Sequence, residues 1–212
     1  MRLLPTLLLL TLAAPAAAGP VTYHFTGAVT FVTASAPDSL DLSGTFHGGD
    51  LATIDVTFDS AIAGYCEADH CVYESPGIGL SSAMIGGYTC TGDTISEAFV
   101  IDGQNFIDYE GITRLHSDLF SFTDGQVAAP TVGTARLMGV TVELVDPDST
   151  ALHSMELPIP MPDLSLFEVR YFRLDFEEPV SHKKGFVYGS LDGILTPARE
   201  SSWGSLKARY RK

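Results

Sequence analysis

The sequence predicts an all-β protein with an antiparallel β-sandwich fold, either jelly-roll-like or a partly open barrel. Short stretches of the chain alternate between apolar and polar residues, which is the two-residue period of a half-buried strand. The 20 glycines and 12 prolines separate these stretches at short intervals, as in turn-rich β-proteins. No long amphipathic helix is evident. These observations favour a single β-domain over residues 19–197.

Residues 1–18 form a separate segment before this domain. A basic start is followed by a short, mainly apolar run, and the small residues Ala16 and Ala18 precede the expected cut. This pattern is typical of a secretory signal peptide. An N-terminal membrane anchor is the less favoured alternative, because about 20 apolar residues are needed to span a bilayer. We therefore expect export to a secreted or periplasmic location and a mature chain that begins near Gly19.

The chain is strongly acidic, with 26 Asp and Glu residues, 12 Lys and Arg residues and a net charge of −14. Its basic residues are concentrated in residues 198–212, which we expect to be a flexible tail. The domain itself is therefore more acidic than the whole chain and repels phosphate groups, which disfavours nucleic acid as a partner. No segment after the signal peptide is long and apolar enough to span a membrane.

The first predicted strand runs from Tyr23 to Phe31, with Tyr23, Phe25, Val29 and Phe31 on the buried face. A second strand follows, in which Ile54, Val56 and Phe58 alternate with polar residues. In residues 83–91, the pair Gly86-Gly87 predicts a two-residue β-hairpin turn.

Two central strands are predicted to end at Asp-Gly turns. Residues 95–101 precede Asp102-Gly103, and residues 119–123 precede Asp124-Gly125. In the next strand, Met138, Val140, Val142 and Leu144 are predicted to face the core, and Thr141 and Glu143 lie on the polar side.

The last predicted strands carry irregularities. Within residues 166–176, the consecutive aromatics Tyr171-Phe172 suggest a bulge, and in residues 186–195 the pair Asp192-Gly193 suggests another bulge or a turn. A short helix near residues 162–166 is expected, because Asp163 can cap it.

The chain has three cysteines. Cys66 and Cys71 are predicted to form a small disulfide loop, as is common in exported proteins. Cys90 is then expected to be a buried free thiol, although its pairing with either of the other cysteines stays open at this point. Within the loop, Glu67, Asp69 and His70 offer ligands for a divalent ion such as calcium. A solvated acidic loop is the favoured alternative, so no metal or other cofactor is predicted.

Enzyme motifs are absent from the sequence. The nucleophile-elbow, zinc-protease, P-loop and dinucleotide-binding patterns do not occur, and the six histidines are dispersed without zinc-ligand spacing. No catalytic residue is therefore predicted, and we expect a non-enzymatic protein.

Several segments resemble a group of exported bacterial proteins that often carry the PEP-CTERM sorting signal and have a predicted β-sandwich domain. The resemblance covers most of residues 21–195 and is carried by residues 23–29, 42–46, 49–50, 56–60, 85–89, 142–146, 157–158 and 189–191. It implies export and a β-sandwich, and it implies no catalytic residue. The sorting signal itself is not evident, because residues 196–200 lead to the basic tail without an apolar segment.

We therefore expect a component of an extracellular matrix or a weak glycan binder. Aromatic side chains can stack on sugars, and Tyr65, Tyr73 and Tyr109 are the candidates. For each of them the alternative is a partly buried loop tyrosine. The alternative function is a hydrolase of extracellular polymers on a jelly-roll-like fold, which requires acidic or histidine side chains along a concave sheet face.

Overall fold

The computed structural model describes residues 19–195, except for residues 35, 37, 75, 93–95, 109–110 and 126. This part of the chain consists of β-strands with one short 3-10 helix, so the all-β prediction is confirmed. The predicted signal peptide and basic tail lie outside the described residues. The elements are β1 (Pro20–Val32), β2 (Leu51–Asp59), β3 (Tyr65–Cys66), β4 (Cys71–Glu74), β5 (Ile78–Ile85), β6 (Tyr88–Gly92), β7 (Ser96–Ile107), β8 (Thr113–Asp124), β9 (Val127–Ala128), β10 (Arg136–Asp146), η1 (Leu164–Leu166), β11 (Val169–Glu177) and β12 (Lys184–Leu195).

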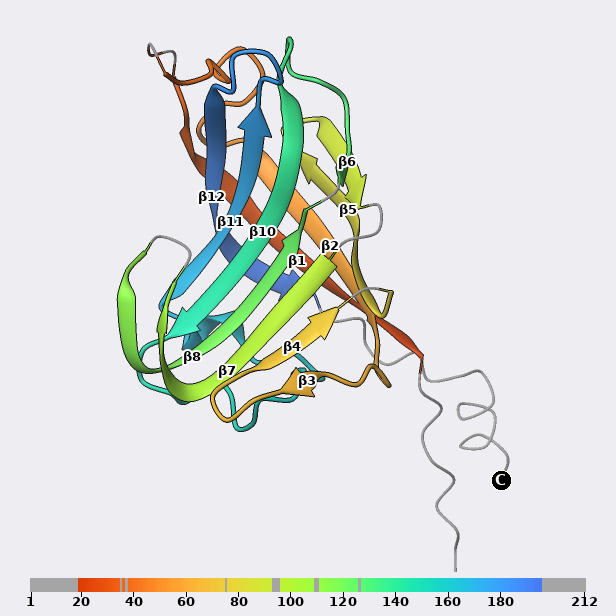
Figure 1. The fold of residues 1–212 in the computed structure, drawn as a ribbon, viewed down its shortest axis with the longest axis vertical. Helices are drawn as coiled ribbons and strands as arrows, with labels where there is room; N and C mark the ends of the chain where they lie inside the picture. The colour runs from red at the N-terminus through yellow and green to blue at the C-terminus, as the bar shows by residue number, and fades with distance from the viewer. Residues whose placement is uncertain are drawn as a thin grey trace, which may run out of the picture.

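The described strands form one antiparallel sheet of 12 strands in the order β3-β4-β7-β8-β10-β11-β12-β1-β2-β5-β6-β9 (Figure 1). The first and last strands, β1 and β12, pair with each other in the middle of this order. The sheet curls strongly along its length, so its two halves face each other. Of the two predicted forms, the structure is the partly open barrel.

The concave side of this half-barrel holds the hydrophobic core. Tyr23 on β1 packs edge-on against Phe58 on β2, with ring centroids 4.7 Å apart, and its ring also lies 6.3 Å from that of Phe120 on β8. Since β8 is four positions from β1 in the sheet, this second contact crosses the interior. Each fully buried aromatic or aliphatic side chain contributes roughly 1.5–3 kcal/mol to folding. The interior is therefore filled with side chains.

The predicted alternation of β1 holds as far as Val29 and then shifts. Tyr23, Phe25 and Val29 are buried, whereas Phe31, which was expected inside, is 55% exposed. In the pairing with β12, Val29 is opposite Gly189 and Phe31 is opposite Tyr188, so Thr30 is an extra residue. This bulge turns Phe31 to the outer face.

The next two predictions are confirmed. Ile54, Val56 and Phe58 of β2 are buried, and β5 and β6 form a hairpin in which Ile85 is opposite Tyr88. Gly86 and Gly87 have φ angles of 55° and 94°, which are the positive values that a type I′ turn requires at both positions.

The predicted turn at Asp102-Gly103 is wrong, because β7 continues to Ile107. The pairing of β7 with β8 shifts register between Ile101 and Gln104, and Gly103 has a φ of 62° at this point. A glycine with positive φ is typical of a bulge that bends a strand without ending it. The strand before Asp124-Gly125 ends where predicted, at Asp124, although it begins earlier than expected.

In β10, the predicted inward position of Met138 is wrong. A register shift between Leu137 and Gly139 places Leu137 in the core and leaves Met138 exposed. Beyond the shift, Val140, Val142 and Leu144 are buried as expected. Thr141 and Glu143, on the side predicted to be polar, are buried as well.

The predicted bulge at Tyr171-Phe172 is wrong, since β11 pairs with β12 in continuous register from Tyr171 to Glu177. Phe172 faces the core, and Tyr171 packs on the outer face against Tyr188. Consecutive aromatics here indicate a strand covered on both faces. The bulge at Asp192-Gly193 is confirmed, because Asp192 is an extra residue in the pairing with β1.

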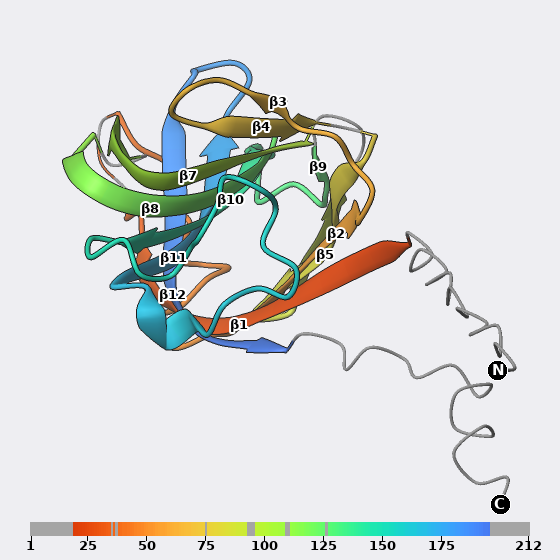
Figure 2. The same ribbon diagram turned by 90° about the horizontal axis from the view of Figure 1, so that it is seen from below.

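Residues 147–168, here called the strap, connect β10 to β11 and run across the lower end of the curled sheet (Figure 2). Two tyrosine hydroxyls hold it. The Tyr23 hydroxyl donates to the Pro158 carbonyl, and the Tyr73 hydroxyl donates to the Met155 carbonyl at 3.0 Å. The expected short helix is the 3-10 turn η1 in this strap, where the Asp163 carboxylate accepts from the Ser165 N–H at 2.9 Å.

Candidate functional site

Aromatic side chains gather on the outer face of the sheet, where β11, β12 and β1 are adjacent. Val187 of β12 is buried, so Phe186 and Tyr188 on either side of it project outward. Tyr188 is opposite Phe31 of β1, which the bulge has turned to the same face. We call Phe31, Tyr171, Phe186 and Tyr188 the aromatic patch.

Tyr188 is the centre of the aromatic patch. Its ring centroid lies 6.1 Å from that of Phe31, 6.2 Å from that of Tyr171 and 6.3 Å from that of Phe186. The rings are tilted against each other by 49–58°, so they form a curved surface. Phe31, at 55% exposed, offers the most accessible ring.

Arg173 of the neighbouring strand β11 holds the rings of Phe186 and Tyr188 in place. Its guanidinium carbon lies 4.2 Å from the ring centroid of Phe186 and 5.4 Å from that of Tyr188. Its Nε donates to Asp175 Oδ1 at 2.9 Å, so its charge is paired. A cation–π contact of this kind contributes about 0.5–1 kcal/mol at exposed sites. The patch is therefore ordered before any ligand binds.

A groove of about 310 Å³ adjoins the aromatic patch and crosses β12, β11, β10 and the end of β8. Arg173 and Phe186 line both the patch and the groove. Its other lining residues are Thr123, Gly125, Met138, Gly139, Thr141, Asp175, Phe176, Glu177 and Lys184. Hydroxyl, carboxylate and ammonium groups thus lie beside aromatic rings, and this combination suits a polyhydroxylated ligand.

None of the three tyrosines predicted to stack on sugars belongs to the aromatic patch. Tyr65 is 69% exposed on the edge strand β3, and its hydroxyl donates to Glu67 at 3.2 Å. Tyr73 is only 4% exposed, so its predicted role in stacking is wrong. Its hydroxyl also accepts from the Leu157 N–H at 3.1 Å, and burial raises its pKa. Tyr109 lies outside the described residues.

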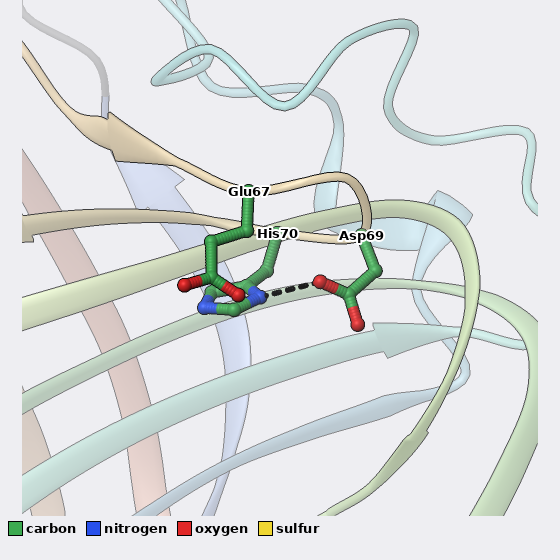
Figure 3. A group of neighbouring side chains, drawn as sticks. All are labelled: Glu67, Asp69 and His70. Atoms are coloured by element: carbon green, nitrogen blue, oxygen red, sulfur yellow. Dashed lines mark hydrogen bonds and ion pairs between the residues drawn. The ribbon is translucent and has the colours of Figure 1, made fainter.

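The disulfide between Cys66 and Cys71 is confirmed, with Cα atoms 4.0 Å apart across the β3–β4 pair. In the loop it closes, Glu67, Asp69 and His70 point to one side (Figure 3), and their potential ligand atoms lie within 4.8 Å of one another. His70 Nδ1 lies 2.8 Å from Asp69 Oδ1, and this hydrogen bond lowers the pKa of Asp69. The carboxylates are exposed to solvent, as in the acidic loop that the sequence favours.

Cys90 is a buried free thiol on β6, as predicted, so the pairing left open is resolved. Burial raises the pKa of this thiol to about 12, and the negative charge of Asp124 adds to the effect. Because the thiolate is the reactive form, Cys90 is inert as a nucleophile at neutral pH.

A histidine, an aspartate and a serine meet on the outer face of β1, β2 and β5. His24 Nδ1 lies 2.7 Å from Asp55 Oδ1, and the Ser82 hydroxyl donates to Asp55 Oδ2 at 3.1 Å. The carboxylate therefore separates the other two groups. In a nucleophilic triad the imidazole must contact the serine, so this arrangement does not activate Ser82.

A larger cavity of about 610 Å³ lies at the seam where the start of β5 approaches β7. Asp124 of β8 is fully buried there, and its Oδ2 accepts from the Ser96 hydroxyl at 2.7 Å and from the Leu80 N–H at 3.4 Å. A Cβ at Gly92 would lie 2.2 Å from this oxygen, so only glycine fits. The carboxylate thus links three strands across the seam, which is a structural role.

The hydrolase alternative requires acidic or histidine side chains along the concave face. In the part of the chain that the structure describes, that face is packed with Tyr23, Phe25, Phe58, Phe120 and Phe122 instead. The described residues therefore do not provide the cleft that the hydrolase alternative needs.

The aromatic patch was missed by reasoning from the sequence, although a signal for it exists. The alternation that predicts a strand over residues 186–195 places Phe186 and Tyr188 on one face of the strand and the buried Val187 on the other face. Two aromatics on the polar side of a strand are unusual enough to mark a surface. Their partner Phe31 was assigned to the core, because the bulge at Thr30 is not visible in the sequence.

Among the described residues, no helix has the length and apolar character needed to cross a membrane. Comparisons of the chain with protein-family models, curated proteins and solved structures found no match. The resemblance to the PEP-CTERM-associated group therefore stays a prediction.

Proposed function

We propose that this chain is an exported, non-catalytic protein that binds carbohydrate through the aromatic patch. The single observation that carries the proposal is the set of four adjacent aromatic rings on the outer face of the sheet, with Phe31 more than half exposed. Large exposed aromatics cost solvation free energy, and a sheet face that retains them marks a binding surface. An extracellular matrix polysaccharide is the kind of partner that we expect.

The surroundings of the rings support a sugar as the ligand. A sugar ring presents C–H groups on its faces, which pack on aromatic rings, and hydroxyl groups at its edges, which need hydrogen-bond partners. Thr123, Asp175 and Lys184 in the adjoining groove supply such partners. The Cys66–Cys71 disulfide is compatible with a secreted or periplasmic location, where disulfides persist.

The test is binding of the purified mature protein to a panel of soluble polysaccharides, measured by affinity gel electrophoresis and then by calorimetry. Phe31→Ala is expected to weaken binding roughly tenfold, which corresponds to about 1.4 kcal/mol. Because Phe31 is largely exposed, its removal should leave the melting temperature nearly unchanged. Tyr188→Ala should weaken binding at least as much, with a lower melting temperature because four groups pack on its ring.

The matched control is Ile107→Ala, which removes an apolar side chain that is 70% exposed on β7, at a distance of several strands from the aromatic patch. It should bind as the unchanged protein does. Failure of every polysaccharide to bind, or equal losses in Phe31→Ala and Ile107→Ala, would refute the proposal.

A further inference from the structure

We infer that the ligand is an uncharged polysaccharide chain that lies across the strands, from Phe31 along the aromatic patch and through the groove to Thr123. This inference rests on the proposed carbohydrate binding and specifies the class of ligand and its path. It is carried by the continuity of the two surfaces and by the charge balance of the groove.

The aromatic patch and the groove form one continuous surface, because Arg173 and Phe186 line both. The surface crosses β1, β12, β11, β10 and β8, which are consecutive in the sheet. Four spacings between neighbouring strands add up to roughly 19 Å. A surface of this length accommodates several linked sugar rings, whereas a single sugar would occupy only a part of it.

The positive and negative charges in the groove balance each other. Arg173 donates to Asp175, and Lys184 is directly opposite Glu177 in the pairing of β11 with β12. Glu177 Oε1 also lies 2.8 Å from His182 Nδ1. Two lysine or arginine cations therefore stand against two carboxylates, so the groove has no excess of positive charge for a uronic acid.

The net charge of the whole chain also disfavours a polyanionic ligand. With a net charge of −14, the protein repels polyanionic polysaccharides at low ionic strength. The hydroxyl group of Thr123, which is partly exposed in the groove and lies 3.3 Å from that of the buried Thr141, is a neutral partner for sugar hydroxyls. An uncharged chain fits both the local and the overall charge.

The experiment measures affinity by calorimetry as a function of ligand charge and length. The probes are β-1,4-linked glucose oligomers of two, four and six units, polygalacturonate as a polyanion and chitosan as a polycation. We expect the six-unit oligomer to bind at least tenfold more tightly than the two-unit oligomer, and polygalacturonate to bind more weakly than an uncharged polysaccharide at low salt.

A pair of variants separates the groove from the aromatic patch. Thr123→Met places a longer uncharged side chain in the groove and should remove the advantage of the six-unit oligomer while leaving the two-unit affinity unchanged. Thr123→Ser keeps the hydroxyl without the bulk and should retain that advantage.

Preferred binding of polygalacturonate or chitosan would overturn the assignment of an uncharged ligand and leave the proposed carbohydrate binding intact. Equal affinities for all oligomer lengths, or an unchanged length dependence in Thr123→Met, would overturn the path through the groove. If no probe and no polysaccharide of the wider panel binds, the proposed function itself fails.

Discussion

Two buried aspartates of this fold, Asp118 and Asp146, are held by backbone N–H groups. Asp118 accepts from Gly103 at 2.9 Å and from Leu152 at 2.8 Å, so it ties the bulge of β7 to the strap. Asp146 accepts from the N–H groups of Asp148, Thr150 and Ala151 at 2.6–2.9 Å. Both carboxylates thus accept hydrogen bonds from backbone N–H groups in irregular segments, where no neighbouring strand supplies a carbonyl partner.

The arrangement around Asp146 predicts an acid-sensitive contribution to stability. Burial alone would raise the pKa of Asp146, but the hydrogen bonds from Thr150, Asp148 and Ala151 outweigh it, so the pKa is lowered. An unfolded aspartate titrates near pH 3.9. The stabilisation is therefore complete above that pH and is lost as the pH falls through the lower pKa of the folded state.

Asp146→Asn should accordingly be less stable than the unchanged protein at pH 7, by about 1–3 kcal/mol, because hydrogen bonds to a charged acceptor are lost. The difference should shrink as the pH falls through the lowered pKa of the folded state, because the aspartate then becomes protonated in both states. Melting temperatures between pH 7 and pH 2 check this. A difference that stays constant over the whole range would contradict it.

At the scale of elements, the β3–β4 hairpin depends on the Cys66–Cys71 disulfide for its order. It contains few residues, and its two strands pair only at Tyr65–Val72 and Cys66–Cys71. β3 is also the edge strand of the sheet and has a single neighbour. The disulfide therefore orders a hairpin that backbone pairing alone holds weakly.

Replacing Cys66 and Cys71 together by serine should cost roughly 2 kcal/mol, because so short a loop restricts the unfolded chain only modestly. For a domain of this size the melting temperature should fall by roughly 4–8 °C. Carbohydrate binding should not change, because the aromatic patch lies across the sheet. Thermal melts and the binding assay check both parts, and loss of the whole fold would show that the hairpin supports more than itself.

The strands themselves could be predicted from the sequence, but their irregular points could not. The strand β2 was predicted correctly because Ile54, Val56 and Phe58 alternate with polar residues. The β5–β6 hairpin was predicted correctly because two consecutive glycines between strands are typical of a two-residue turn. The bulges at Thr30 and Gly103 depend on which strand pairs alongside, and the sequence of one strand does not contain that information. As a result Phe31 was assigned to the core, and the aromatic patch that it joins was not found.

At the scale of the whole molecule, the half-barrel is stabilised by its aromatic core and by the strap across one end. The cluster of Glu67, Asp69 and His70 lies on the surface, and His70 Nδ1 already has a hydrogen-bond partner in Asp69. Exposed carboxylates of this kind are well hydrated.

We therefore expect the melting temperature to be the same with a chelator and with millimolar calcium. An ion present at 100 times its dissociation constant would stabilise the fold by about 2.7 kcal/mol, which a melt detects readily. Asp69→Asn is the matched variant, since it removes one ligand without bulk. A calcium-dependent rise that this variant abolishes would contradict the expectation and establish a binding site in the disulfide loop.

The pairing of β12 with β1 has a consequence for when the chain can fold. Among the described strands, only β12 pairs both with β11 and with β1. Backbone pairing between the two halves of the sheet, one ending at β11 and the other beginning at β1, therefore requires residues 184–195. Contacts between the two ends of a chain also form slowly. A polypeptide that is synthesised from its N-terminus thus cannot close this sheet until residues 184–195 have been made.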